Sequence, residues 1–304
     1  MKNQLLQDFT CLIPLYKSKR FLSIIEENIE EHLKYGAHVL VSDMHGYDDV
    51  PEMLKARYGQ HENVVIHVGS NGGDWVDNIN FLIRQTETRF ARIVPHDDTA
   101  LPGSSAALVA LLLKHPDAIL ATGEAELLDV QGKPLPAAFH PHILPQAYTC
   151  PSTLDGALSF LWLGKFPGSF KGVFDAQVVR ERQLYIKKTP GLVVADHLWV
   201  NALFTAGRFE FLPMKVLAKR FYPESTHKSW RYTPEVYLGI GDVLYEYFRE
   251  QIADEGLLAK ARFVIYHNAI RRARYCSDEI GHYPGYNAVS PMEGGGNKPI
   301  FPPR

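Results

Sequence analysis

The sequence predicts an α/β protein built on a mostly parallel β-sheet with helices on both faces. Segments of strand character alternate with segments whose apolar residues recur at helical spacing, from residue 9 to residue 129. Such alternation is typical of parallel sheets, whose crossover connections place helices on both faces. Acidic and aromatic residues stand where the predicted strands end. Because ligands of open α/β sheets bind beyond the carboxyl ends of the strands, we expect these residues to share one crevice.

The individual elements follow from the local pattern. Buried-strand patterns cover residues 9–16, 37–43, 63–69, 90–95 and 118–129. Helical patterns cover 22–33, a segment that begins at Pro51, 75–83 and 104–114. Further along, the patterns predict a surface excursion over 133–158, a strand and turn over 168–179, a helix closed by Gly207 over 195–207, a strand over 208–213 and two helices over 234–277. The many glycines and prolines of 281–304 indicate a loop, an arm or disorder.

Composition describes an ordinary globular protein. Of the residues, 46% are hydrophobic and 22% are charged, and the net charge is -2, so bulk charge does not indicate nucleic acid as a partner. Cys11, Cys150 and Cys276 are far apart and have no metal-ligand spacing, which favours a reducing cytoplasm. The longest apolar run, 106–113, is too short to span a bilayer, and no signal-peptide pattern is present. We therefore expect a cytoplasmic protein that meets a membrane only at its surface.

The stretch RIVPHDDTALPG places two adjacent acids, Asp97 and Asp98, at the end of a predicted buried strand. Two like charges repel each other in a poorly hydrated place, and a cation or a hydroxyl-rich ligand usually relieves that repulsion. The alternative is that one acid caps a following helix. One carboxylate would suffice for a cap, so the pair favours a ligand site.

Three other residues each allow two interpretations. Asp43 either belongs to the crevice or stabilises a turn that contains Gly46. Tyr16 either stacks on a ligand or packs in the core. Asp196, in VVADHLW, begins a predicted helix and is either a general base or a helix cap. Burial would raise the pKa of Asp196 toward the range useful for proton abstraction, whereas the helix dipole would lower it.

Taken in order, these motifs resemble the family 2 glycosyltransferases with the GT-A fold. The matching motifs are IPLY, VSD, an Asn-bearing helix after a Gly-rich loop, HDD and ADHLW. The resemblance runs from about Phe9 to Ser225, roughly two thirds of the chain. It implies the inverting transfer of a sugar from a nucleotide-diphosphate donor to a hydroxyl acceptor. A divalent cation, Mn²⁺ or Mg²⁺, would assist by neutralising the charge that develops on the diphosphate leaving group.

The resemblance also implies roles for individual residues. Those on the donor side are Pro14 and Tyr16 at the nucleotide base, Asp43 as acceptor from its imide N–H, Asn80, and Asp97 at the ribose. Asp98 would ligate the cation, with His96 and His227 as further candidate ligands. Asp196 would be the catalytic base, and the acceptor side would include His197 and Trp199, although Trp199 is equally compatible with the core.

The chain departs from the family pattern at three positions, which bear on metal and phosphate binding. Ala195 stands where a Glu often precedes the base, Ile79 where an Arg often precedes the helix Asn, and Tyr222 where a His often adds a metal ligand. These departures leave open a second class of function, a nucleotide-sugar-binding protein without catalysis. A nucleotidyltransferase is a third possibility, but PLYKSKRF contains none of the glycines of its usual phosphate loop.

The domain organisation expected from these patterns has four parts. Residues 1–132 would bind the nucleotide sugar, 133–233 would form the acceptor side with the base, 234–280 would add helices, and 281–304 would be a tail. The expected partners are the nucleotide-sugar donor and a saccharide or lipid-linked acceptor, without nucleic acid. Basic residues on the last predicted helix form either a solvated face or a contact with anionic lipid at the inner face of the membrane. They are Lys260, Arg262, Arg271, Arg272 and Arg274.

Overall fold

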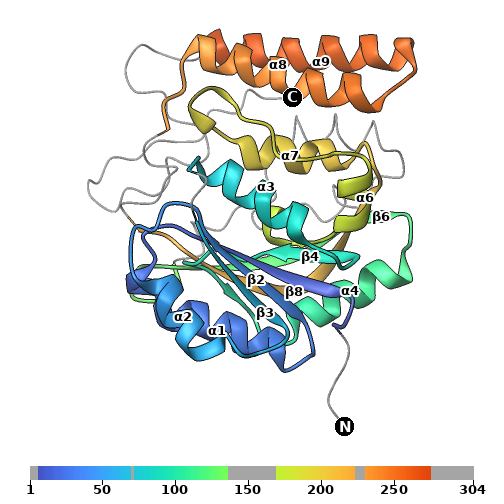
Figure 1. The fold of residues 1–304 in the computed structure, drawn as a ribbon. Coiled ribbons are helices and arrows are strands. Elements are labelled where there is room, and N and C mark those ends of the chain that lie inside the picture. Colours follow the sequence, from blue (N-terminus) through green and yellow to red (C-terminus); the bar gives the residue numbers. More distant parts are fainter. Residues whose placement is uncertain (1–5, 70–71, 136–168, 223–229, 275–304) are drawn as a thin grey trace.

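The computed structural model describes residues 6–69, 72–135, 169–222 and 230–274. Figure 1 shows a curled sheet between two layers of helices, with a helical hairpin stacked on the upper layer. The strand order is β3-β2-β1-β4-β7-β6-β8-β5. The strands are β1 (Phe9–Leu15), β2 (His38–Asp43), β3 (Val64–Val68), β4 (Phe90–Ile93), β5 (Thr99–Ala100), β6 (Ala118–Leu128), β7 (Val173–Asp175) and β8 (Arg208–Arg220). The predicted α/β architecture with a mostly parallel sheet is confirmed.

The four strands β3, β2, β1 and β4 run parallel to one another. Every residue of β1 is buried, as its unbroken apolar sequence predicts for a central strand covered on both faces. Its register pairs Leu15 with Asp43, so β1 and β2 end at the same level of the sheet. Strand β4 pairs with β1 on the other side. The carboxyl ends of β1, β2 and β4 therefore form one edge.

Helices cover the two faces of the sheet, in agreement with two separate clusters of buried apolar residues. On one face lie α1 (Leu22–Leu33), α2 (Val50–Tyr58) and α4 (Ser104–Lys114). On the other lie α3 (Trp75–Gln85), α6 (Ala176–Glu181) and α7 (Ala195–Leu203). Short 3-10 turns occupy Lys19–Phe21, Ser169–Lys171 and Pro190–Leu192. Helix α4 has the predicted bounds, and α1 and α3 begin where their apolar spacing predicted.

The second half of the sheet differs from the prediction. Strand β7 enters antiparallel between β4 and β6, and the two-residue β5 pairs antiparallel with β8. Strands this short carry no periodic signal, so pattern alone does not find them. Within the segment predicted as strand and turn, Asp175 accepts a hydrogen bond from the Val178 amide and starts α6. Strand β8 extends well beyond the predicted 208–213 and reaches Arg220.

Gly207 has a different role from the predicted one. Helix α7 ends at Leu203, and Gly207 lies in the connection to β8. A Cβ atom there would lie 2.7 Å from the carbonyl oxygen of Asp117 and 3.0 Å from the amide of Ile119. The glycine is therefore required by the close approach of β8 to the start of β6, not by helix termination.

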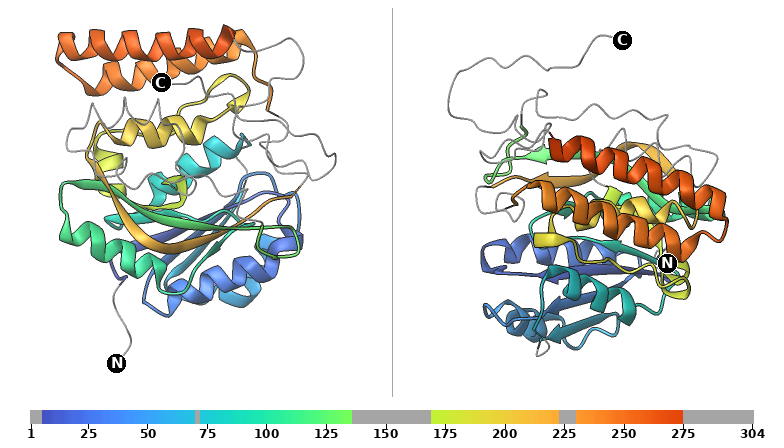
Figure 2. Two further views of the ribbon diagram at one scale, coloured as in Figure 1. Left: turned by 180° about the vertical axis from the view of Figure 1, so that it is seen from behind. Right: turned by 90° about the horizontal axis from the view of Figure 1, so that it is seen from above.

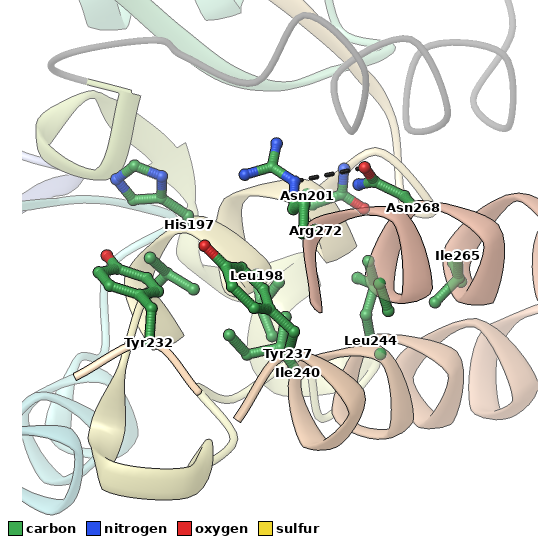
Figure 3. Close-up of a pocket in the computed structure, with 13 residues that line it drawn as sticks. His197, Leu198, Asn201, Tyr232, Tyr237, Ile240, Leu244, Ile265, Asn268 and Arg272 are labelled. Carbon is green, nitrogen blue, oxygen red and sulfur yellow. Dashed lines mark hydrogen bonds between the residues drawn. The ribbon is translucent and has the colours of Figure 1, made fainter. Parts of the chain in front are cut away.

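A helical hairpin, α8 (Pro234–Gln251) and α9 (Glu255–Arg274), confirms the two predicted C-terminal helices. Figure 2 shows it stacked over α7. The Tyr247 hydroxyl accepts from the Lys187 amide at 2.6 Å and donates to the Tyr185 carbonyl at 2.7 Å, which fixes α8 to the chain before α7. Helices α7, α8 and α9 line a cavity (Figure 3). Among the described residues, no helix has the length and apolar composition that crossing a bilayer requires.

Most of the predicted excursion 133–158, His227 and the tail 281–304 lie outside the described residues. The predicted division of the chain into functional parts stays a prediction. The hairpin and the sheet nevertheless share one apolar cluster, which contains Phe248 of α8 and Ile265 of α9 together with Leu12 of β1.

Candidate functional site

Asp43 ends β2 and is fully enclosed. Its Oδ1 atom accepts hydrogen bonds from the backbone amides of His45, at 3.0 Å, and Gly46, at 3.1 Å. Gly46 has a φ of 61°, which a glycine adopts without strain. Of the two interpretations of Asp43, the turn is thus present in the structure, and a contact with a nucleotide base stays a prediction that concerns the remaining oxygen.

Two exposed tyrosines face each other beyond β1 and β2. Tyr16 is 45% exposed and Tyr47 is 49% exposed, and their rings meet edge to face at 5.1 Å between centroids. The ammonium of Lys17 lies over both rings, at 5.3 and 5.4 Å. Tyr16 is therefore not a core residue, and the two rings, which meet almost at right angles, offer exposed aromatic surface to a ligand. The sequence interpretation missed Tyr47, whose only signal is its position just after a strand end.

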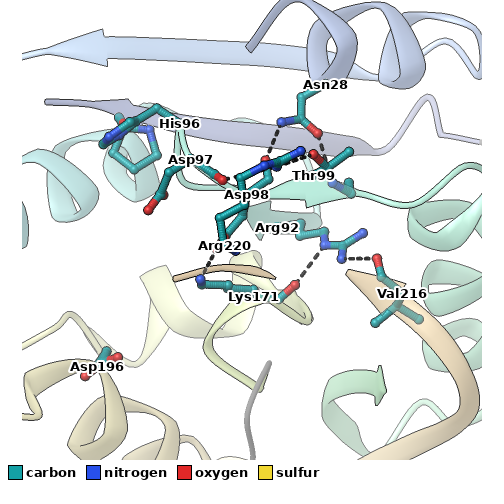
Figure 4. Close-up of polar contacts among 12 residues, drawn as sticks. Asn28, Arg92, His96, Asp97, Asp98, Thr99, Lys171, Asp196, Val216 and Arg220 are labelled. Carbon is teal, nitrogen blue, oxygen red and sulfur yellow. Dashed lines mark hydrogen bonds and ion pairs between the residues drawn. The ribbon is translucent and has the colours of Figure 1, made fainter. Parts of the chain in front are cut away.

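The two acids after β4 have different environments (Figure 4). Asp98 is only 1% exposed, and both of its carboxylate oxygens are engaged. The Lys171 ammonium forms an ion pair with Oδ2, and the Arg220 amide donates to Oδ1 at 3.1 Å. Burial raises the pKa of Asp98, and the charge of Lys171 only partly offsets this effect. Helix α4 begins at Ser104 with Gly103 as its N-cap, so neither acid caps it.

Asp97 is partly exposed, and its Oδ2 accepts a hydrogen bond from the Tyr222 hydroxyl at 2.8 Å. Burial alone would raise its pKa, but the charges of His96 and Lys171 and the bond from Tyr222 outweigh it and lower the pKa. His96 Nδ1 lies 3.2 Å from the carbonyl oxygen of Pro14, which ties the acid loop to the end of β1. The two neighbouring carboxylates therefore have different pKa values. The pKa of Asp97 is lowered and that of Asp98 is raised, so Asp97 ionises more readily.

A buried hydrogen-bond network holds the loop of the acid pair. The Asn28 side chain donates to the Asp98 carbonyl at 2.8 Å and accepts from the Ala100 amide at 2.9 Å. His32 Nδ1 lies 2.7 Å from the Asn28 carbonyl, which can only accept, so the proton sits on Nδ1 and Nε2 accepts from Ser105. Burial lowers the pKa of His32 to about 4, and the neutral ring is what this network requires.

Lys171, which the sequence interpretation missed, is positioned by a buried arginine. Arg92 on β4 donates to the Lys171 carbonyl and to the Val216 carbonyl, both at 2.8 Å, and to the hydroxyls of Ser104 and Ser105 at 2.9 Å. It is fully buried, and burial lowers its pKa to about 10. No local pattern around Lys171 signals its role, because its contact with Asp98 depends on the way β7 enters the sheet.

The surroundings of the two acids decide which of them suits a divalent cation. Among the described residues, no three His, Cys, Asp or Glu side chains gather as a complete metal cluster. Asp98 is already engaged by Lys171 and Arg220, whereas Asp97 receives one hydrogen bond at Oδ2 and is partly exposed. One carboxylate oxygen suits a hard cation whose other ligands come from water and phosphate, so Asp97 fits this role better than Asp98. Tyr222, which replaces the His of the family pattern, contacts Asp97 directly.

Asp196 lies in the first turn of α7 and does not cap it. The N-cap is Val194, and the Asp196 Oδ1 atom is buried with no hydrogen-bond partner among the described residues. Its Oδ2 lies 3.9 Å from His197 Nε2. Figure 4 shows Asp196 apart from the acid pair, on the side of the site to which Lys171 belongs. A buried carboxylate oxygen without a donor is costly in a fold and is the state expected of a base that awaits a proton.

Backbone strain occurs beside both halves of the site. Val194 has a φ of 51° and Lys17 a φ of 47°, in the left-handed region that side chains rarely adopt. The strain at Val194 is the more unusual, because a β-branched residue is disfavoured there by roughly 1 to 3 kcal/mol. Lys17 follows Tyr16, and Val194 precedes Asp196 by two residues. Such strain tends to persist at functional sites.

Asn80 and Trp199 both make contacts inside the fold. Asn80 donates to and accepts from the backbone of Ile186, at 2.8 Å in each direction, so its amide holds the chain before α7, and its contact with the donor stays a prediction. Asn78, on the same helix, donates to the carbonyl of Ser42 near the end of β2, at 3.1 Å. Trp199 is completely buried, and its indole N–H donates to the Leu184 carbonyl at 2.7 Å, so the core interpretation of this residue is the one observed.

Ala195 and Ile79, two of the departures from the family pattern, are both buried in the apolar cluster beneath α7. The Glu and the Arg that often occupy these positions would bring charge into this cluster. The chain thus lacks both charges, and the cations described near the acid pair, among them Lys171 and Arg220, come from other segments.

Comparison with known proteins decides the fold. No protein-family model and no curated protein sequence matches the chain. S. aureus TarS 1-349 in complex with UDP-GlcNAc is similar in structure, with a TM-score of 0.64 and 13% identity over 92% of this chain and 79% of that chain. The fold is GT-A. The same TarS segment in complex with UDP has a TM-score of 0.58, at 13% identity over 88% of this chain and 72% of that one.

The similarity extends to a second protein. The mannosyltransferase PcManGT from Pyrobaculum calidifontis, in complex with GDP-Man and Mn²⁺, has a TM-score of 0.52 and 13% identity over 93% of this chain and 78% of that chain. The predicted GT-A fold is confirmed by these matches. At such identities similarity establishes the fold, and the chemistry has to be argued from the residues of this chain.

Proposed function

We propose that this protein is a glycosyltransferase of family 2 type that moves a sugar from a nucleotide-diphosphate donor to a hydroxyl acceptor with inversion. The observation that carries the proposal is Asp196, whose buried Oδ1 has no hydrogen-bond partner among the described residues, on a fold whose strand ends bear an acid pair. Solved structures that share the fold include complexes with UDP-GlcNAc, UDP and GDP-Man, which supports a nucleotide sugar as donor.

The donor base is assigned to the ends of β1 and β2. The exposed rings of Tyr16 and Tyr47 supply an aromatic surface, and Pro14 lies beside them at the end of β1. Asp43 has one carboxylate oxygen that is not used in the turn. A carboxylate there would accept from the imide N–H of uracil or guanine, and it would find no such donor on adenine.

The diphosphate is assigned to the space beside Asp97. We propose Asp97 and not Asp98 as the cation contact, because both carboxylate oxygens of Asp98 are already engaged, by Lys171 and Arg220. His96 is a neighbour of Asp97, and His227 stays a predicted ligand outside the described residues. A bound Mn²⁺ or Mg²⁺ would neutralise the charge of the departing diphosphate. Burial opposes ionisation of Asp97, but the charges of His96 and Lys171 lower its pKa below the ordinary value, and Lys171 also pairs with Asp98.

The transfer step is a single displacement. An acceptor oxygen attacks the anomeric carbon while the bond from that carbon to the diphosphate oxygen breaks, and the electron pair leaves with the nucleoside diphosphate. The acceptor proton passes to the Asp196 carboxylate, whose Oδ1 accepts no competing bond within the described chain. Attack opposite the leaving group inverts the anomeric configuration. The acceptor is a saccharide or a lipid-linked molecule.

A thermal-unfolding panel tests this function. The melting temperature is measured with UDP, GDP and ADP, each with and without Mn²⁺, and the corresponding sugar nucleotides are then assayed for release of diphosphate. We expect UDP or GDP with Mn²⁺ to raise the melting temperature by mass action and ADP to raise it less. Equal shifts with all three would remove Asp43 from the base site. A nucleotide shift without any turnover would favour the non-catalytic binding protein.

A further inference from the structure

One side of helix α9 is exposed along most of its length. The helix buries Ala261, Ile265 and Ala269, which recur at helical spacing on the side that packs into the protein. The α8–α9 hairpin is the outermost helical layer on its side of the sheet (Figure 1). Four exposed residues lie along α9 opposite the buried ones, and they form what is called here the outer stripe. They are Lys260, Phe263, Ile270 and Arg274.

The middle of the outer stripe is apolar. Phe263 is 72% exposed and Ile270 is 45% exposed. The ring of Phe263 stacks on that of His267 at 5.9 Å between centroids, and this contact leaves most of the Phe263 surface in water. A single exposed apolar residue needs no explanation. Phe263 and Ile270, however, are about two helical turns apart and so face the same direction.

A cation stands at each end of the outer stripe. Lys260 and Arg274 are both exposed, and the sequence of α9 contains no Asp or Glu after Glu255. The two cations are roughly 20 Å apart along the helix axis, at the ordinary rise of an α-helix. One small anion therefore cannot contact both of them. An extended negative surface can.

Three acids of the neighbouring α8 are engaged elsewhere. Asp242 accepts a hydrogen bond from the Tyr266 hydroxyl at 2.6 Å. Glu246 and Glu250 pair with Lys187, at 2.9 and 2.7 Å, on the side of α8 that meets the chain before α7. These carboxylates therefore do not neutralise the outer stripe, which keeps its positive charge.

The combination of charge and apolar surface decides among possible partners. A second copy of the chain, docked stripe to stripe about a two-fold axis, would place Lys260 against Lys260 or Arg274 of the other copy, so like charges would meet. Nucleic acid would match the cations but would bury the aliphatic side chain of Ile270 against a charged backbone. The surface of a bilayer with anionic lipid offers negative headgroups and an apolar layer directly beneath them.

We infer that the outer stripe of α9 docks this protein on the surface of a bilayer that contains anionic lipid. Phe263 and Ile270 enter the boundary between headgroups and acyl chains, while Lys260 and Arg274 extend to the lipid phosphates. Two apolar side chains and two cations give reversible attachment. The inference goes beyond the proposed transfer reaction and does not depend on it, although docking would bring the protein close to a lipid-linked acceptor.

Co-sedimentation of the full chain with lipid vesicles tests the inference. One set of vesicles is phosphatidylcholine alone, and the other is an equal mixture of phosphatidylcholine and phosphatidylglycerol. We expect binding to the mixed vesicles that weakens as salt is raised, because salt screens the headgroup charge. Phe263→Ser should weaken this binding roughly tenfold. Lys260→Gln/Arg274→Gln should weaken it roughly tenfold or more.

Matched controls lie on the helices that cover the other face of the sheet. Leu113→Ser removes an apolar side chain that is 59% exposed on α4. Lys55→Gln/Lys114→Gln removes the same charge from exposed positions of α2 and α4. Both controls should bind the mixed vesicles as the natural protein does. Every substituted side chain is exposed, so the melting temperature should stay nearly the same in all variants.

Several results would overturn the inference. They are no binding to the mixed vesicles, equal binding to both kinds of vesicle at every salt concentration, and equal losses in the stripe and control variants. A dimer in the absence of lipid that Phe263→Ser abolishes would assign the outer stripe to a second copy instead. Binding of an oligonucleotide in place of vesicles would assign it to nucleic acid. Nucleotide binding, measured on the same variants, reports on the proposed function separately.

Discussion

The ammonium of Lys171 and the buried carboxylate of Asp98 form an ion pair between positions 73 residues apart. The lysine side chain is 13% exposed and that of the aspartate 1%. Neither side chain is well hydrated, so each depends on the other for compensation of its charge. The pair also joins the segment just before β7 to the loop after β4, although these two segments are distant in the sequence.

The first prediction concerns this pair. Lys171→Met should lower the free energy of unfolding by roughly 3 to 5 kcal/mol at pH 7, because Asp98 is left as a buried charge without a counterion. The double variant Lys171→Met/Asp98→Asn should recover part of that loss. Chemical denaturation of the single and double variants measures the coupling. Strictly additive losses would show that the pair carries no interaction energy.

The second prediction concerns His32. Its pKa falls to about 4 in the folded protein, from 6.5, because the ring is buried, and the hydrogen bond to the Asn28 carbonyl offsets this effect only in part. The unfolded chain therefore binds more protons between these values, so the contribution of His32 to stability is complete above pH 6.5 and is lost as the pH falls toward 4. The loss should be on the order of 3 kcal/mol.

Denaturation curves at pH 7 and pH 4.5 measure this loss. His32→Gln is the matched control, because glutamine is polar and does not titrate. The variant should be less stable at pH 7 but should lose less on acidification than the natural protein. Parallel pH profiles for the two proteins would contradict the assignment.

The sequence predicted the half of the fold that local periodicity encodes. Buried strands such as β1 and amphipathic helices such as α3 can be recognised from the spacing of their apolar residues alone. Strands β5 and β7 do not, because they have two and three residues and exist only through their partners. Gly207 was assigned to helix termination because sequence shows a flexible residue but not the strand that packs against it.

The same limit applies to the site. Asp97, Asp98 and Asp196 are predicted site residues because acids at the ends of strands and helices can be recognised in the sequence alone. The different environments of Asp97 and Asp98 were not, because Lys171 and Tyr222 reach them from distant segments. The backbone contacts of Asn80 with Ile186 and of Asn78 with Ser42 likewise join segments that are distant in the sequence.

The third prediction separates the two acids. Asp97→Asn should weaken the binding of UDP with Mn²⁺ roughly tenfold or more, since the variant loses a charged oxygen beside the diphosphate. Asp98→Asn makes the same charge change one residue away, and it should alter stability while leaving nucleotide affinity nearly unchanged. Isothermal titration with and without Mn²⁺ distinguishes them. The reverse pattern would return the cation to Asp98.

The last prediction concerns Asp196. Asp196→Asn keeps the shape of the side chain and removes the base, so transfer should fall by about two to four powers of ten. Nucleotide binding and melting temperature should stay nearly the same, because α7 is not capped by this residue and Oδ1 makes no hydrogen bond among the described residues. His197→Gln is a useful comparison, since its ring lies 3.9 Å from the carboxylate but cannot replace it in a direct displacement.

The stereochemistry of the product gives an independent test of the same assignment. In a single displacement no sugar is bound to the enzyme, so the anomeric configuration must invert in every turnover. NMR of the product formed by the natural protein reads the configuration from the anomeric coupling. Retention would require a second displacement or a different reacting face, and either would remove the reason for placing a base at Asp196. Inversion together with loss of transfer in Asp196→Asn is the combination expected when this carboxylate takes the acceptor proton.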